Sequence, residues 1–291
     1  MTQTPQNSDL SMAIKYNVGQ TQVALSVADM YQRGYRETPH WHDDWEFFAP
    51  IVGGLHVFVN GRDYPVAEGT GLLVNSDRLH YAFTARRTDC RFVDLALNPD
   101  MLGQLKGTDI SQLRRKMSLA APDVVELTTT TPWQATILDR LHLLGNAYRF
   151  GGSDPLTVAT EALAICTRVL PRIHVADEPM RGPIAGEQRA FQMVDFIQQH
   201  YFEPLTASQI AASVHISRSQ CFNLFQEVLH TGPNAYLQQV RLERAAAELR
   251  TTRKSVAEIA QDCGFGTASH LIATFKGVMG VTPRKYRVAN G

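Results

Sequence analysis

The sequence lacks any apolar run that approaches the ~20 residues of a membrane-spanning helix. Its N-terminal residues are polar and have no basic start followed by an apolar stretch, so we do not expect a secretory signal there. We expect instead a short loose tail, no membrane partner, and a cytoplasmic protein.

Cysteine is scarce and scattered. The chain has four cysteines, none of them in a Cys-x-x-Cys pair: Cys90, Cys166, Cys221 and Cys263. This spacing argues against a zinc knuckle or a disulfide framework. It favours reduced, buried thiols in a reducing compartment.

An excess of charge of either sign is absent as well, because 28 basic and 28 acidic residues leave a net charge of zero. Taken alone, this balance argues against a nucleic-acid-binding protein. The charge is unevenly divided, however. Residues 187–291 carry 11 basic and 8 acidic residues, a net charge of +3, and residues 1–186 carry −3. The sign of the C-terminal part is the one expected if that part faces phosphates.

The length of the chain suggests about two domains. Between residues 23 and 97 the pattern is that of short strands: Leu55–Val59 alternates in polarity, and Asn60-Gly61 is a strong hairpin turn. Many short strands with regular turns predict a β-sandwich or a small barrel.

Helical patterns follow the strands. One helix is predicted to begin at Pro132 and end at Phe150, and a second to begin at Asp154-Pro155 and end at Pro171. Two prolines and two glycines among polar residues then indicate a linker. The predicted fold class is α+β with two domains: a tail at 1–22, a barrel at 23–130, a helical segment at 131–171, a linker at 172–186, and an all-α domain at 187–291.

The last hundred or so residues contain an internal near-repeat with an offset of 49 or 50 positions. Ile210-Ala211 corresponds to Ile259-Ala260. Each copy begins with a short helix, capped by Thr206 in one copy and by Ser255 in the other, and continues through a tight turn into a second helix. The pattern predicts two helix-turn-helix units.

A long helix from Pro233 to Arg250 is predicted to join the two units. Eighteen residues span about 27 Å, which brings the two second helices near the ~34 Å of one DNA turn. The alternative is an ordinary helical bundle. Two matched copies with a rod between them favour DNA binding over that alternative.

Helical geometry predicts which side chains of the second helices enter the major groove. They are Arg218, Ser219, Gln220, Phe222 and Asn223 in the first unit, and Ser269 and His270 in the second. The predicted phosphate contacts, each of which is otherwise a solvated charge, are Arg241, Lys276, Arg284 and Lys285.

The two units differ in their predicted reading surfaces. In the first, Phe222 either lies against a thymine methyl group or packs on the neighbouring helix. In the second, Ile272 and Ala273 offer few polar groups to base edges. We therefore expect the second unit to position the protein on the DNA backbone more than it specifies bases.

This region resembles the DNA-binding domain of the AraC/XylS family of regulators. The resemblance is carried by residues 255–260, Gly264-Phe265, Thr274-Phe275-Lys276 and residues 280–287. Members of that family bind double-stranded DNA with both units and usually control nearby genes, often for sugar or carbon metabolism. The resemblance implies a transcription regulator rather than an enzyme, with RNA polymerase as a further partner if the chain is an activator.

The most unusual local segment is His40-Trp41-His42, followed by Trp45 and Glu46. In a strand, the two histidines face one side and Trp41 faces the other. His80 lies downstream. Three histidines and a carboxylate in a small barrel are a suitable ligand set for a divalent metal.

This arrangement resembles motif one of the cupin superfamily, with His80 where motif two supplies its ligand and with Asn75-Ser76 in place of the usual proline. Cupin-like sensor domains often precede the helices of AraC/XylS regulators. Three interpretations stay open. The four residues bind a metal ion, or they line an effector pocket with Trp41 or Trp45 stacking on the ligand, or they are hydrogen-bonded residues kept from a metal-binding ancestor.

The leading hypothesis is a sequence-specific DNA-binding regulator that responds to a small-molecule effector, such as a sugar or a related metabolite, in the cupin-like barrel. The alternatives are a metal-dependent cupin enzyme fused to a DNA-binding domain, and a constitutive regulator with a vestigial barrel. The apolar helix faces within 131–171 either pack against their own barrel or pair two subunits. The resemblance implies a homodimer, because this region pairs two subunits in related regulators.

Overall fold

The computed structural model describes residues 11–19, 21–84, 88–104, 109–118, 120–151, 154–177 and 187–290. The chain divides into two compact units. Ser11–Tyr31 and Pro39–Gly182 belong to the first, and Gln32–Thr38 and Pro183–Gly291 belong to the second. Residues 32–38, which the sequence pattern assigns to the barrel, thus group with the second unit. Most of the predicted tail and linker lies outside the described residues.

The first unit contains a five-stranded antiparallel sheet with the order β1-β7-β2-β5-β8. Its strands are β1 (Val23–Asp29), β2 (Trp45–Val52), β5 (Gly71–Val74), β7 (Arg91–Leu97) and β8 (Val124–Leu127). Successive side chains of a strand point to opposite faces. Trp45 and Phe47 of β2 therefore lie on one face, in a large apolar core, and Glu46 lies on the other.

A second antiparallel sheet has the order β4-β3-β6. Its strands are β3 (Leu55–Val59), β4 (Arg62–Val66) and β6 (His80–Phe83). Asn60 and Gly61 join β3 to β4 with φ angles of 45° and 85°, as the predicted two-residue hairpin turn requires. Two antiparallel sheets of short strands agree with the predicted sheet-rich domain, and closure into a cupin-like barrel stays a prediction.

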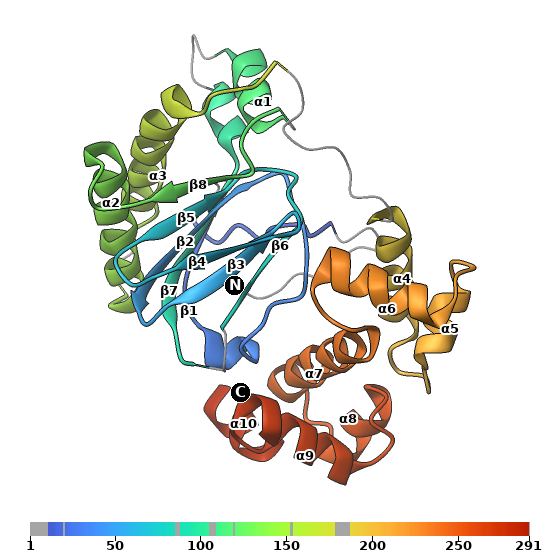
Figure 1. Cartoon of the computed structure of the whole chain (residues 1–291). Coiled ribbons are helices and arrows are strands. Elements are labelled where there is room, and N and C mark those ends of the chain that lie inside the picture. Colours follow the sequence, from blue (N-terminus) through green and yellow to red (C-terminus); the bar gives the residue numbers. More distant parts are fainter. Residues whose placement is uncertain are drawn as a thin grey trace. The chain divides into compact units, whose positions relative to one another are not determined.

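Two helices pack on the five-stranded sheet (Figure 1). They are α2 (Pro132–Arg149) and α3 (Pro155–Val169), and both begin where the sequence predicts, with proline in the first turn. The Asp154 side chain caps α3 by accepting a hydrogen bond from the amide of Thr157. The shorter helices of this part of the chain are α1 (Ile110–Met117) and 3-10 turns at Met30–Arg33, Pro99–Gln104 and Leu170–Arg172.

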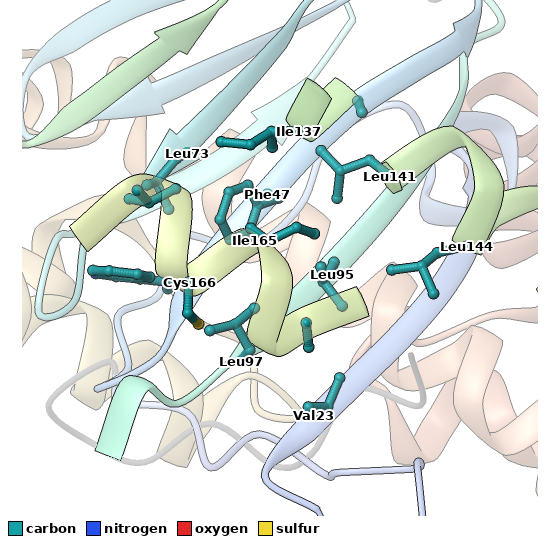
Figure 2. Close-up of a cluster of buried hydrophobic side chains, with 14 of the residues drawn as sticks. Val23, Phe47, Leu73, Leu95, Leu97, Ile137, Leu141, Leu144, Ile165 and Cys166 are labelled. Atoms are coloured by element: carbon teal, nitrogen blue, oxygen red, sulfur yellow. The ribbon is translucent and has the colours of Figure 1, made fainter. Parts of the chain in front are cut away.

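The core of the first unit lies between these helices and the sheet. Figure 2 shows side chains from α2 and α3 directed at the sheet, among them Ile137, Leu141, Leu144, Ile165 and Cys166. They meet side chains of four strands, namely Val23, Phe47, Leu73, Leu95 and Leu97. Cys166 belongs to this core, and all four cysteines of the chain are buried and free, as predicted.

The helices of the second unit cover the C-terminal hundred residues. They are α4 (Glu187–His200), α5 (Ala207–Ala212), α6 (Arg218–Leu229), α7 (Pro233–Thr251), α8 (Val256–Asp262), α9 (Ala268–Met279) and α10 (Pro283–Asn290). The predicted joining helix is α7, which ends one residue later than expected. Among the described helices, none combines the length and the apolar character needed to cross a membrane.

Each helix-turn-helix unit consists of a short first helix and a longer second helix, and helix caps set where these helices begin. Thr206 and Gln209 form a capping box at α5, and Ser255 and Glu258 form one at α8, as the sequence predicts. The second helices are not buried equally along their apolar faces. Leu224 of α6 is only half-buried, whereas Leu229 and Met279 at the helix ends are buried.

The turns inside the two helix-turn-helix units have related backbones but different residues. His215 and Gly264 occupy corresponding positions, both with left-handed φ angles, of 57° and 76°. A Cβ atom at Gly264 would overlap the carbonyl oxygen of Tyr201. The second turn also contains one extra residue, Gly266, before the cap Thr267. This insertion explains why the offset of the repeat changes from 49 to 50.

Candidate functional site

Four polar residues of the first unit meet on the face of the five-stranded sheet opposite α2 and α3. Glu46 projects from β2, and His80 is the first residue of β6. The segment before β2 lies beside β6, since the amide of His40 donates to the carbonyl of His80 at 3.0 Å and the amide of His80 donates back at 2.8 Å. This bridge brings together His40, His42, Glu46 and His80, which we call the His/Glu cluster.

The His/Glu cluster is compact and buried. One ligand atom from each of its four residues lies within 4.8 Å of the other three. The same oxygen of Glu46, Oε2, is 3.0 Å from Nε2 of His42, 2.7 Å from Nε2 of His80 and 3.9 Å from Nε2 of His40. Three imidazole rings are therefore directed at one carboxylate oxygen.

The electrostatics of the His/Glu cluster favour an ionised carboxylate. Burial raises the pKa of Glu46, but the hydrogen bonds and charges of His42 and His80 outweigh burial and hold this pKa well below its usual value. The pKa of His42 is raised, because Glu46 and Asp44 outweigh the opposing effect of burial. The cluster thus combines a buried negative charge with nitrogen donors.

The orientation of His80 tests whether the cluster fits a metal ion. Its Nδ1 lies 2.7 Å from the carbonyl oxygen of Arg78, and because a carbonyl only accepts, Nδ1 carries a hydrogen. In the neutral ring, Nε2 then presents a lone pair to the Glu46 carboxylate, so a cation, either a proton or a metal ion, must lie between them. Metal-ligating histidines are commonly held in this way, with the other ring nitrogen donating to a carbonyl.

The donor distances also fit an ion. Two metal–ligand bonds of about 2.1 Å span at most about 4.2 Å. Donor atoms within 4.8 Å of one another therefore need to shift only slightly to ligate one ion. Imidazole and carboxylate donors together suit divalent zinc, iron, nickel or manganese. The residues present thus fit the metal that the sequence suggests.

The second unit presents the predicted DNA-contacting side chains on two helices. Arg218, Ser219, Gln220 and Asn223 are exposed along α6, and Ser269 and His270 are exposed at the start of α9. The three remaining exposed basic side chains of the predicted set are Lys276 on α9, and Arg284 and Lys285 on α10. Within the second unit taken by itself, all of these side chains are exposed to solvent.

Comparisons with known proteins match this architecture. Residues 210–289 match the model of a helix-turn-helix domain. The HTH-type transcriptional activator RhaS of Salmonella paratyphi B is 30% identical over 257 residues, which cover 85% of this chain and 86% of RhaS. The chain belongs to the AraC family of helix-turn-helix transcription regulators. It is a DNA-binding regulator of transcription.

Two further relatives of this AraC-family regulator are similar over different lengths. The uncharacterized HTH-type transcriptional regulator YdeC of Bacillus subtilis is 26% identical over 254 residues, which cover 86% of each chain. A transcriptional regulator from Chromobacterium violaceum with an AraC-type DNA-binding domain, known from a crystal structure, is 34% identical with a TM-score of 0.35. It covers 37% of this chain and 96% of its own.

Three of the regulator's predicted DNA contacts have local roles in the structure. The Gln220 side-chain oxygen accepts hydrogen bonds from the amide and hydroxyl of Ser217 and so helps to cap α6. Phe222 is half-buried, and the Arg218 guanidinium carbon lies 5.4 Å from its ring centroid. The ring also lies next to Gly232, before α7, which favours the packing interpretation over a thymine contact.

Arg241 requires a correction. It is half-buried, and its Nε and Nη2 donate to the carbonyl oxygens of Tyr201 and Glu203, both at 2.7 Å. A guanidinium held in this way fixes the segment after α4 and is not a free phosphate contact. Its partners lie about 40 positions away in the chain, so no local pattern could reveal this role.

Trp45 requires a second correction. Its indole is fully buried in the core under α2 and α3, and Nε1 donates to Oδ1 of Asn75 at 2.7 Å. Trp45 therefore faces away from Glu46 and does not line a pocket beside the His/Glu cluster. Trp41 is only partly buried, and its stacking on an effector stays a prediction.

The sequence pattern gives no indication of Arg78, which the structure places beside the His/Glu cluster. Arginine is rarely fully buried, yet the Arg78 side chain is. The only signal in the sequence is its position two residues before His80, and that signal does not distinguish a surface arginine from a buried one.

Proposed function

We propose that this AraC-family regulator controls transcription in response to a divalent transition-metal ion held by His40, His42, Glu46 and His80 in a cupin-like domain. The observation that carries the proposal is the convergence of three imidazole nitrogens on one oxygen of Glu46, with the His80 ring fixed by the bond from its Nδ1 to a carbonyl oxygen. The burial of all four residues favours a small ion over a large organic ligand directly among them.

We propose that the small-molecule effector binds to the metal ion. When bound, a metal with four protein ligands supplies open coordination positions for oxygen atoms of a ligand such as a sugar or a related metabolite. The effector changes DNA binding only if it binds one arrangement of the protein better than another. The names of relatives such as the melibiose operon regulatory protein of Escherichia coli support a sugar as the class to test first.

We further propose that α6 reads the sequence of double-stranded DNA. Arg218 and Asn223 are exposed on the same helix, and the first hydrogen-bonds guanine well, the second adenine. The Phe222 ring holds the Arg218 guanidinium over the surface of α6 and so limits its motion. Ser269 and His270 on α9, with Lys276, Arg284 and Lys285, contact mainly the DNA backbone in this proposal.

The surface of the regulator and the names of its relatives support two proposed partners. Leu143, Phe150 and Leu156, on α2, after it and at the start of α3, are exposed apolar side chains, which supports a homodimer formed through these helices. RhaS is named a transcriptional activator. We propose that this chain also activates transcription in the cytoplasm, with RNA polymerase as its partner.

The metal proposal is tested on the full chain by elemental analysis and thermal unfolding. We expect one Zn²⁺, Fe²⁺, Ni²⁺ or Mn²⁺ per chain and a higher melting temperature when the metal is added to chelator-treated protein. His80→Gln abolishes both. The matched control is His56→Gln, because His56 is a partly exposed residue of β3, outside the His/Glu cluster, that pairs with Asp63. Absence of metal and of any thermal shift in the unaltered chain would overturn the proposal.

The regulatory part is tested by DNA binding. Sequences selected by the full chain from a random duplex pool provide a target site. Affinity for that site is then measured with and without the metal. A metal-dependent change that disappears in His80→Gln but persists in His56→Gln is expected. Equal affinities in all conditions would leave a regulator without metal control.

A further inference from the structure

Arg78 is a buried arginine whose hydrogen-bonding groups are used completely. Its side chain is fully buried, and its five N–H groups can serve five acceptors. These acceptors are Asp123 Oδ1, and the carbonyl oxygens of Ser76, Met117, Ser118 and Ala121, at 2.7–3.3 Å. Arg78 thus joins the loop between β5 and β6 to the chain between α1 and β8.

One end of this connection is the His/Glu cluster. The carbonyl of Arg78 holds Nδ1 of His80 at 2.7 Å, and the amide of Asp77 donates to the carbonyl of His42 at 2.8 Å. Two cluster residues are therefore fastened to the backbone of the loop that carries Arg78. A shift of the His80 imidazole or of the His42 backbone on taking up an ion is therefore passed directly to this loop.

Asn75 forms a second connection between the same two segments. Its side-chain amide donates to the carbonyls of Lys116 and Pro122, both at 3.1 Å, and its backbone amide donates to the carbonyl of Asp123 at 2.9 Å. Arg78 and Asn75 together tie the loop to residues 116–118 and to residues 121–123. Buried groups of this kind cannot move separately without leaving donors unsatisfied.

The other end of the connection is the end of the first unit. The Lys116 ammonium donates to the carbonyl of Ile173, and the amide of Ala176 donates to the carbonyl of Ala120 at 2.9 Å. Ile173 is buried in the core. In the sequence, Ile173 and Ala176 lie at the start of the predicted linker, and the DNA-binding helices begin at Glu187 with α4.

We propose that Arg78 is a positioning residue that holds His80 and transmits occupancy of the His/Glu cluster to residues 173–176 at the start of the linker. The proposal rests on the proposed metal site for its physiological signal. The connection itself consists of hydrogen bonds within the first unit. It supplies what a ligand-dependent regulator needs, namely a physical link from its site to the segment that leads to its DNA-binding helices.

The connection is tested by amide hydrogen exchange on the full chain, read from peptides covering residues 40–46, 74–80 and 170–177. We expect His80→Gln to speed exchange in residues 170–177 by at least about threefold, because opening of the braced segment becomes easier. His56→Gln, the matched control, leaves this peptide unchanged. Faster exchange at 74–80 with no change at 170–177 would overturn the inference.

Two further variants separate transmission from stability. Adding metal to the unaltered chain should slow exchange in all three peptides. In Arg78→Lys, which keeps the charge but loses the planar set of donors, metal should still protect 40–46 but no longer protect 170–177. Lys116→Met, with exposed Lys15→Met as its control, removes one contact to Ile173 and should reduce that protection without disturbing the core.

The outcomes distinguish the two proposals. Metal protection at 40–46 without protection at 170–177 in the unaltered chain overturns the connection and leaves the metal site standing. No metal effect in any peptide overturns the metal site, and the response of 170–177 to His80→Gln then decides the connection alone. A protection at 170–177 that survives in both Arg78→Lys and Lys116→Met also overturns it.

Discussion

The two helix-turn-helix units have nearly the same frame and very different surfaces. In both, a capped short helix leads through a left-handed turn into a twelve-residue second helix, α6 or α9. In corresponding positions, α6 exposes Asn223 where α9 exposes Ala273, and Phe222 is half-buried where Ile272 is exposed. The shared frame sets where each helix lies within its unit, and the surface decides what that helix can recognise.

The basic residues show the opposite distribution. Arg284 and Lys285 are exposed on α10, which follows the second helix-turn-helix unit. Asn234 and Ala235 occupy the corresponding positions on α7, which follows the first. The first helix-turn-helix unit thus exposes the side chains proposed to discriminate bases, and the second exposes the charges proposed to bind phosphates.

The largest difference between the units is expected from Gly264→Ala. Alanine in a left-handed conformation and overlap with the Tyr201 carbonyl together cost about 2–5 kcal/mol of unfolding free energy. His215→Ala, at the corresponding position of the first unit, should cost less than about 1 kcal/mol, because a side chain is already accommodated there. Chemical unfolding of the full chain measures both, and equal losses would refute the difference.

The next effect concerns base reading. Asn223→Ala should weaken binding to a selected target site by about 1–3 kcal/mol, that is, by about 5–150-fold, and leave binding to random duplex DNA unchanged. Titrations of both DNAs with the full chain provide the measurement. An equal loss on both DNAs would remove Asn223 as a base reader.

A smaller and less selective effect is expected from the second unit. Arg284→Glu should weaken binding to every duplex and lower the slope of log affinity against log salt by about one. Asn234→Ala, at the corresponding position in the first unit, is the control and should leave that slope unchanged. A loss confined to the target site would show that Arg284 reads bases.

The smallest effect is expected from Ile272→Ala. If α9 chiefly positions the protein, this change should alter the affinity for the target site by less than about threefold, since at most a thymine methyl contact is lost. A change of tenfold or more would mean that α9 also specifies sequence. The two units would then be more alike in function than their polar surfaces indicate.

Local signals made much of the fold predictable. The caps Thr206 and Ser255, the Asn60-Gly61 turn and the proline at the start of α2 depend on residues close in the chain, and the structure has them where the sequence predicts. The alternation of a strand also explains an error. Glu46 and Trp45 are adjacent, so they face opposite sides of β2, and a shared pocket was not available to both.

Long-range contacts account for what the sequence could not reveal. Arg241 bonds to carbonyls about 40 positions earlier, and Arg78 bonds to carbonyls about 40 positions later. The neighbouring residues in the sequence do not distinguish either arginine from an ordinary surface arginine. Only the tertiary structure shows that backbone oxygens have taken the place of phosphate or water.

The uninterrupted helix α7, from Pro233 to Thr251, limits how such a regulator can evolve. Each residue added to an α-helix turns everything beyond it by about 100° and advances it by about 1.5 Å. A single insertion in α7 would rotate α9 relative to α6 and, if both helices contact DNA as proposed, would change the spacing of their two contact sites. Length changes are tolerated more readily in the turns, as the additional Gly266 shows. If α6 reads bases as proposed, point substitutions on α6 can change the target sequence while α7 keeps the spacing of the two second helices constant.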